Sequence, residues 1–224
     1  MKVLLSLLLF LSIVNASDEE KYKKGEKIYN QTCLSCHGAD GSGNHLVSFI
    51  VNPRSLTKTI LTEEQSYKIV KYGAHVMGAA ADIMPSFKSV LQESELRAVT
   101  YYMYEKFNPQ AEKRIHELYT QSDVIPVNKQ ATMLHQGKKI YNRNCSGCHG
   151  LNGKGNGEAT KTPKVSIYPY NLTKSLLDEK QMFLYVKYGG KYWGTNKNDM
   201  PSWSKKYDDY TLKSIVKYVK TQLH

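Results

Sequence analysis

One pattern of residues occurs twice in this chain, and this repeat constrains the fold more than any other feature. Residues 25–30 (GEKIYN) return as residues 137–142 (GKKIYN), an offset of 112. Further along the offset is 116, where residues 84–87 (MPSF) match residues 200–203 (MPSW), so the second copy carries four extra residues in a loop. Each copy of about 90 residues is long enough for a small domain, and the repeat therefore predicts two tandem domains.

The segment between the two copies has no counterpart in the repeat. It contains two X-Pro steps, which interrupt regular structure, although residues 111–119 can form a short helix. We therefore predict a first domain at residues 17–108, a linker at 109–130 and a second domain at 131–224.

The amino terminus has the pattern of a secretory signal peptide. Lys2 precedes an apolar run over residues 3–14, and the small residues Ala16 and Ser17 follow. The run is too short for a bilayer, which takes about 20 residues, and no polar face marks it as an amphipathic helix. We predict that residues 1–16 are removed near Ala16 and that the protein is exported to the periplasm. Because no second apolar run exists, the sequence predicts no membrane span.

Local signals predict that each copy is helical. Residues 62–65 (TEEQ) and 178–181 (DEKQ) match helix-capping patterns, and Gly73 and Gly189 are typical helix stops. Apolar side chains between residues 96 and 103 recur every three or four positions, as on an amphipathic helix. No segment alternates as a strand does, so the predicted fold class is all-α.

Each copy also contains the pattern Cys-x-x-Cys-His, at residues 33–37 and 145–149. This is the c-type haem attachment pattern, because two thiols on one turn can form thioethers with both vinyl groups of one porphyrin. The histidine that follows is then held beneath the iron as an axial ligand. The sequence thus predicts two covalent haem c groups. The predicted thioether residues are Cys33, Cys36, Cys145 and Cys148, and the predicted histidine ligands are His37 and His149.

Three other uses of these cysteines are possible. A thioredoxin-type redox pair expects a βαβ context that this sequence lacks. Two Cys-x-x-Cys pairs that share one zinc ion are usually about 15 to 20 residues apart, whereas a whole domain separates these two. Disulfides are compatible with export. Neither zinc nor a disulfide explains a histidine at the same place in both copies.

Met84 and Met200 are the predicted second axial ligands of the two haem irons. They match in the repeat, and a proline follows each. A thioether opposite histidine raises the reduction potential relative to two histidines. Met77 and His75 are rivals in the first copy, but their counterparts in the second are a tryptophan and a lysine, which cannot do the same work.

At these motifs the chain resembles the class I cytochromes c, and its tandem arrangement resembles the two-domain dihaem cytochromes c₄ of bacterial periplasms. The resemblance covers essentially the mature chain and implies two small helical domains, each wrapped around one haem c. It also implies that the first and last helices of each domain cross through a glycine and aromatic rings. The residues concerned are Gly25, Tyr29 and Tyr102, and then Gly137, Tyr141 and Tyr218.

The resemblance further implies residues around each haem. The backbone carbonyls of Pro53 and Pro169 occupy the position that accepts the imidazole N–H of the histidine ligand. Donors to the haem propionates are also needed, and the candidates are Arg54, Tyr170, Tyr192, Trp193 and Trp203.

The leading functional hypothesis is a periplasmic electron carrier that moves single electrons between respiratory or dehydrogenase complexes, and not an enzyme. One alternative is the haem subunit of a dehydrogenase complex, such as a sulfide-oxidising flavoprotein. A second is a dihaem enzyme, either a peroxidase or a thiosulfate dehydrogenase. Against an enzyme, both copies keep a Met-Pro, and haem attachment uses all four cysteines.

The positive charge of the chain lies almost entirely in its second half. The whole chain has a formal net charge of +11. Residues 18–108 carry 11 basic and 11 acidic side chains, whereas residues 131–224 carry 16 basic and 6 acidic side chains. Export makes nucleic acid a poor partner. We expect a redox protein partner with an acidic face that docks on the second domain.

Overall fold

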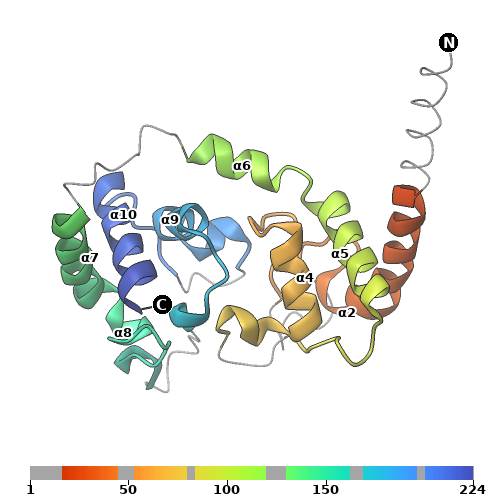
Figure 1. Ribbon diagram of the computed structural model, residues 1–224, viewed down its shortest axis with the longest axis horizontal. Coiled ribbons are helices and arrows are strands. Elements are labelled where there is room, and N and C mark those ends of the chain that lie inside the picture. Colours follow the sequence, from red (N-terminus) through yellow and green to blue (C-terminus); the bar gives the residue numbers. More distant parts are fainter. Residues whose placement is uncertain are drawn as a thin grey trace, which may run out of the picture.

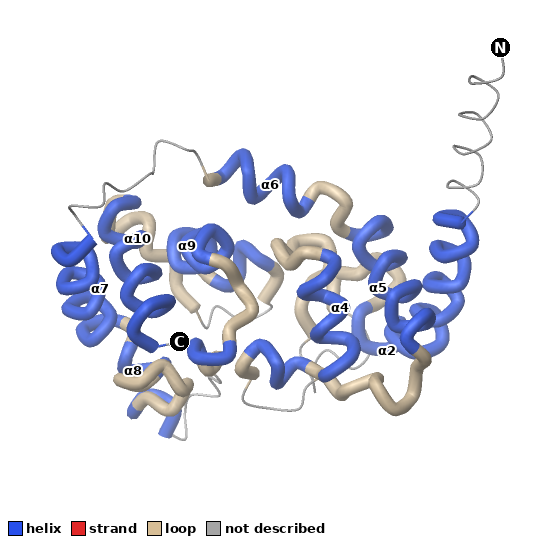
Figure 2. The backbone as a smooth tube through the Cα atoms, viewed as in Figure 1, coloured by secondary structure: helices blue, strands red, loops and turns tan. Residues whose placement is uncertain are grey.

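The computed structural model describes residues 17–44, 53–79, 84–119, 130–161, 169–195 and 200–223, and the predicted signal peptide lies outside these ranges. Figures 1 and 2 show helices joined by loops, with the two halves of the chain side by side. No strand occurs in the described ranges, so the all-α prediction is confirmed. Within the same ranges, no helix combines the length and the apolar character needed to cross a membrane.

The two halves use the same order of helices. The first half contains a helix over residues 17–28, η1 (Tyr29–Cys33), α2 (Leu34–His37), α4 (Glu63–Tyr72), η2 (Ala74–Met77) and α5 (Glu93–Phe107). The segment predicted as linker contains α6 (Ala111–Leu118). The second half contains α7 (Gln130–Asn144), α8 (Ser146–His149), η5 (Glu158–Lys161), η6 (Leu172–Lys174), α9 (Glu179–Tyr188), η7 (Gly190–Trp193), α10 (Asp209–Tyr218) and η8 (Val219–Leu223).

The expected helix signals are present at α4 and α9. Thr62 and Asp178 each form a complete capping box with the glutamine three residues later. These boxes satisfy amide groups that have no partner inside the helix. Gly73 and Gly189 end the helices with φ of 87° and 78°, which a residue with a Cβ adopts only with strain.

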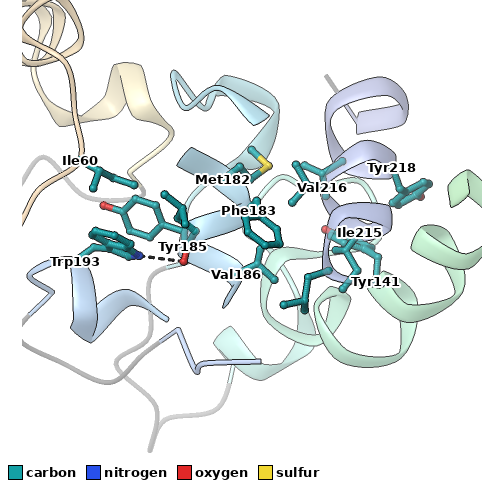
Figure 3. Close-up of a cluster of buried hydrophobic side chains, with 13 residues drawn as sticks. Ile60, Tyr141, Met182, Phe183, Tyr185, Val186, Trp193, Ile215, Val216 and Tyr218 are labelled. Carbon is teal, nitrogen blue, oxygen red and sulfur yellow. Dashed lines mark hydrogen bonds between the residues drawn. The ribbon is translucent and has the colours of Figure 1, made fainter. Parts of the chain in front are cut away.

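In each domain, two helices cross so closely that only glycine fits at the contact. A Cβ on Gly137 of α7 would lie 2.0 Å from the carbonyl oxygen of Ser214 in α10. A Cβ on Gly25 would lie 2.1 Å from the carbonyl oxygen of Ala98. Beside the second crossing, the rings of Tyr141 and Tyr218 lie 5.5 Å apart (Figure 3). The expected pairing of the terminal helices is thus confirmed.

The two domains meet along a boundary that has approximate two-fold symmetry. The Ser55 amide donates to the Gly194 carbonyl at 3.0 Å, and its repeat counterpart Asn171 donates to Gly78 at 2.7 Å. The side chains of Gln65 and Gln181 repeat the same exchange. Each donates to a backbone carbonyl of the other domain at 2.7 Å, and the two amides bond to each other at 2.8 Å.

Side chains also cross the boundary. Ile60 of the first half belongs to the core of the second domain, where Figure 3 places it beside Trp193 and Tyr185. Helix α6 follows the first domain and contacts α9 of the second, and Figure 1 shows it lying over both halves. Tyr119, the residue after this helix, forms an edge-to-face pair with Phe183 of the second domain, with ring centroids 5.6 Å apart.

Replacing Gly137 tests the helix crossing. Gly137→Ala forces a methyl group against the Ser214 carbonyl, and we expect a loss of about 1–3 kcal/mol in the free energy of unfolding. Denaturant unfolding of the haem-loaded protein measures it. The matched control is Gly147→Ala, because no described atom lies within 4 Å of a Cβ at that position. Equal stability of the two variants would contradict a tight crossing.

Candidate functional site

Each Cys-x-x-Cys-His motif occupies a single helical turn. In the second domain the His149 amide donates to the Cys145 carbonyl at 2.8 Å, which closes the turn at the start of α8. Helix α2 has the same place in the first domain. Gly38 and Gly150 end the two turns with φ of 77° and 78°. Both thiols and the imidazole of each motif therefore share one turn, as haem attachment requires.

A backbone carbonyl fixes the tautomer of His149. Its Nδ1 lies 3.1 Å from the carbonyl oxygen of Tyr170. Because a carbonyl only accepts, Nδ1 carries the proton, and the lone pair of Nε2 is left to bind a metal ion. His37 has the equivalent surroundings. Its Nδ1 is buried against the main chain of Arg54, the repeat counterpart of Tyr170, without a hydrogen bond of normal geometry among the described residues.

The carbonyl that holds the imidazole is not the one that the sequence led us to expect. In the second domain Tyr170 has this role, one residue after Pro169. The carbonyl oxygens of Pro53 and Pro169 instead face the glycine loops, where a Cβ on Gly43 or Gly155 would lie 2.5 Å away. The prediction was wrong by one residue because these close backbone contacts turn each proline carbonyl away from the histidine.

Burial sets the protonation of the motif side chains. It lowers the pKa of His37 and His149, so both imidazoles are neutral near pH 7 and can act as metal ligands. Burial, reinforced by the neighbouring thiol, raises the pKa of Cys33 and Cys145 to about 12. These cysteines therefore remain thiols at neutral pH.

This chemistry does not match the other uses of a Cys-x-x-Cys pair. Redox-active pairs have a lowered cysteine pKa, opposite to the shift at Cys33 and Cys145. None of the four cysteines is in a disulfide. Among the described residues, no three His, Cys, Asp or Glu side chains are placed to hold a metal ion together. A shared zinc site is thus not supported.

The predicted haem-binding residues of the second domain line one cavity. Cys145, Cys148 and His149 line one side together, and Met200 lines the same cavity from a different part of the chain. Most of the remaining lining is apolar, and it includes Tyr141, Leu172, Leu177, Met182, Val186, Ile215, Val216 and Val219. A flat, apolar macrocycle with an iron at its centre suits this lining.

The two predicted methionine ligands are held by the same backbone contact. The Gly190 amide donates to the Met200 carbonyl at 2.9 Å, and the Ala74 amide donates to the Met84 carbonyl at 3.0 Å. Met84 packs against the first core, which contains buried Cys33. The first domain therefore brings its predicted methionine to the same core as its haem attachment motif.

The candidate propionate donors separate into two groups. Trp203 lines the cavity, and its buried indole N–H has no hydrogen-bond partner among the described residues, as expected of a donor reserved for a bound group. Arg54 and Tyr170 line the cavity as well. Trp193 is a different case, because its N–H donates to the Leu184 carbonyl at 3.0 Å (Figure 3).

Two further residues differ from the sequence expectations. Tyr192 is half exposed and lies outside the described lining of the cavity. Met77, the rival axial ligand of the first domain, instead lines the cavity of the second. No sequence pattern indicated that Met77 reaches the cavity of the other domain, because this contact depends on how the two domains pack.

The donor set in the second cavity fits a haem c. Two thiols and a neutral imidazole lie on one turn, a thioether lies on a separate segment, and a buried N–H is available for a carboxylate. Cys145 and Cys148 would hold the porphyrin, and His149 and Met200 would supply nitrogen and sulfur to the iron. The low polarity of the lining would keep water from the metal.

Comparison with known proteins agrees with this chemistry. The chain matches the family described as cytochrome C oxidase, cbb3-type, subunit III, over residues 20–103 and again over residues 132–219. The two matches coincide with the two copies of the repeat. The fold and the resemblance to dihaem class I cytochromes c are thereby confirmed.

Two curated relatives show how far the similarity extends. The cbb3-type cytochrome c oxidase subunit CcoP of Azospirillum brasilense is 24% identical over 205 residues, which are 87% of this chain and 60% of that protein. The subunit FixP of Bradyrhizobium diazoefficiens is 24% identical over 203 residues, 88% of this chain and 59% of that protein. The chain thus spans about three fifths of the length of these relatives.

A solved structure shares the fold. A chain of the Kuenenia stuttgartiensis reducing HAO-like protein complex matches with a TM-score of 0.50 and 24% identity, over 90% of this chain and 96% of that one.

Removing one motif tests haem attachment. In the double variant Cys145→Ala and Cys148→Ala, the second domain loses both thioether bonds, so we expect the covalently bound haem to fall from two groups to one per chain. Intact-mass measurement gives the number directly. The matched double variant at Cys33 and Cys36 should give the same result. Two haems on either variant would refute attachment at that motif.

Proposed function

Because the chain belongs to the cytochrome c oxidase, cbb3-type, subunit III family, we propose that it is an electron carrier that passes single electrons through two His/Met-ligated haem c groups. The family binds haem c, and the two matches in this chain correspond to two haems. The observation that carries the proposal is the convergence of Cys145, Cys148, His149 and Met200 on one apolar cavity.

The residues around the cavity suit one-electron transfer. When bound, the haem supplies an iron that changes oxidation state by one electron. The Tyr170 carbonyl holds the His149 imidazole in one orientation, and the Gly190 amide holds the backbone of Met200. His149 and Met200 would hold the iron, and because the protein fixes both residues, they would move little when the iron changes oxidation state.

The same arrangement disfavours an enzyme. A peroxidase needs an iron with an open or openable position, whereas both domains provide a methionine at the matching place. A thiosulfate dehydrogenase of this kind commonly uses a cysteine ligand, and all four cysteines are in the attachment motifs. We therefore propose a role in electron transfer without catalysis.

The second domain is the proposed docking site for an acidic redox partner. Lys206 donates to Asn144, a cavity-lining residue, at 2.9 Å, and Lys191 follows the lining residue Gly190. Their counterparts in the first domain are not lysines, namely Val90 and His75. Positive charge is therefore concentrated where the second haem site approaches the surface, which favours an acidic partner there.

We also propose that the carrier works in the periplasm. The support is the amino-terminal pattern of a charged residue, a short apolar run and a small-residue cleavage site. Covalent haem attachment through both motifs is compatible with this location.

A second candidate is suggested by the relatives. The similarity to subunits of cbb3-type cytochrome c oxidases extends over 87% of this chain, so the protein can equally serve as the electron-entry subunit of such an oxidase. Affinity purification from the native cells separates the two. Stoichiometric recovery with oxidase subunits supports the subunit role, and recovery of the dihaem protein alone supports the free carrier.

Optical redox titration tests the central proposal. Two low-spin haems with methionine ligation are expected. Met200→His should lower the reduction potential of one haem by a sizeable part of the roughly 0.8 V range that axial ligands span. Met84→His should lower that of the other. Ready binding of carbon monoxide to the reduced wild-type protein would contradict closed axial coordination.

Charge reversal tests the docking face. Lys191→Glu with Lys206→Glu should slow electron exchange with a carboxylate-coated electrode about tenfold at low salt. The difference should vanish near 1 M salt, where charges are screened beyond about 3 Å. The matched control reverses Lys138 and Lys139, two exposed lysines of α7. An equal effect of both pairs would show that only net charge matters.

A further inference from the structure

Arg54 belongs to the first domain but places its side chain in the haem site of the second. Its Nη1 donates to the hydroxyl of Tyr185 at 3.0 Å, and its guanidinium lies 4.6 Å from the ring centroid of Tyr170. Both tyrosines belong to the second domain and line the same cavity as His149 and Met200. The main chain of Arg54 meanwhile lies against His37 of the first domain. One residue therefore contacts both predicted haem sites.

Within the part of the chain that the structure describes, the charge of Arg54 has no partner of opposite sign. Among the described residues, no carboxylate lies within ion-pair distance of its guanidinium, and its partners are the side chains of two tyrosines. Arg97 of the same domain shows the contrast, because its guanidinium lies 2.6 Å from a carboxylate oxygen of Glu64. Arg54 is partly buried. Withdrawing an arginine from water without an anion is destabilising, so its position points to an anion that the described residues do not provide.

The cavity has no acidic side chain in its described lining. Arg54 is the one lining residue there that carries a permanent charge, since the buried imidazole of His149 is neutral. Haem c brings two propionate carboxylates, and a guanidinium pairs well with a carboxylate.

The domain boundary fixes the side chain in this place. Ser55, the next residue, donates its amide to the Gly194 carbonyl of the second domain at 3.0 Å. On the other side of Tyr170, the Asn171 amide donates to Gly78 at 2.7 Å. The backbone on both sides of the Arg54–Tyr170 contact is thus anchored across the boundary, which holds the backbone of Arg54 next to the second cavity.

We propose that Arg54 of the first domain is the charge partner of a propionate on the haem of the second domain, and that it raises the reduction potential of that haem. A reduced haem carries one more negative charge than an oxidised haem, so a nearby positive charge favours reduction. The repeat counterpart of Arg54 is Tyr170, which has no guanidinium group. The first haem therefore receives no reciprocal charge, and the second haem is the one at which electrons collect.

This inference rests on the proposed function, because it concerns the same haem. Its test is spectroelectrochemistry of the full haem-loaded chain. To assign the two redox steps, the measurement is made in the Met84→His background, where the first haem titrates at much lower potential and the upper step belongs to the second haem.

Arg54→Gln should lower the upper step by about 59 mV or more, which is a tenfold change in the equilibrium constant for one electron. Arg54→Lys keeps the charge and should restore most of the potential. Arg97→Gln, the matched control, removes an arginine that already has a carboxylate partner, and both steps should stay in place. The four boundary bonds from Ser55, Asn171, Gln65 and Gln181 remain in the Arg54 variants, so both should fold.

The outcomes separate this inference from the proposed function. An upper step that does not move in Arg54→Gln, or a shift confined to the lower step, would overturn the role of Arg54 while two working haems upheld electron transfer. If Arg54→Gln does not load two haems, Arg54→Lys decides, because loss of the wild-type potential despite retained charge would also overturn the proposal. Absence of two reducible haems in the parent protein would instead refute the proposed function.

Discussion

The backbone hydrogen bonds between Ser55 and Gly194 and between Asn171 and Gly78 determine how the rest of this molecule is arranged. Both glycines have φ near 85°, and a Cβ on Gly78 would lie 2.1 Å from the Asn171 carbonyl oxygen. The backbone segments of the two domains can approach this closely only because neither glycine has a side chain. Once this contact forms, Arg54 and Met77 enter the second cavity and Ile60 enters the second core. The predicted haem site of the second domain and the domain boundary are thus built in part from the same residues.

Local features of the fold could be predicted from the sequence because their causes are local. Capping boxes, glycine stops and the Cys-x-x-Cys-His turn each depend on residues within about five positions of one another. The repeat extended these predictions, since a feature at the same place in both copies, such as Met84 and Met200, is unlikely to be chance. The helix crossing at Gly137 also followed, from the resemblance to class I cytochromes c.

The remaining features depend on contacts between distant segments. The imidazole partner is Tyr170 and not Pro169, because the contact of Gly155 with Pro169 turns one carbonyl away. Trp193 uses its N–H inside the core, which residue type alone does not reveal. Arg54 was a reasonable propionate donor from sequence, but its position in the other domain follows only from how the two copies pack.

The two copies share the residues that determine the fold and differ in several residues around the predicted haem sites. The crossing glycines, tyrosines and attachment motifs are identical in kind. Arg54 corresponds to Tyr170, while Lys191 and Lys206 correspond to His75 and Val90. One architecture therefore carries two electrostatic environments, and a few side chains around the two predicted haem sites make the difference.

Helix α6 adds a constraint of its own. Arg114 in this helix donates to the carbonyls of Thr57 and Thr59 at 3.1 and 2.9 Å, while Tyr119 packs on Phe183 of the second domain. The segment between the domains is therefore a brace that contacts both of them. With the boundary bonds and this brace together, the spacing of the two prosthetic groups is set by the fold itself. Electrons exchanged between two haems bound in this chain would therefore cross a distance that the packing of the two domains sets.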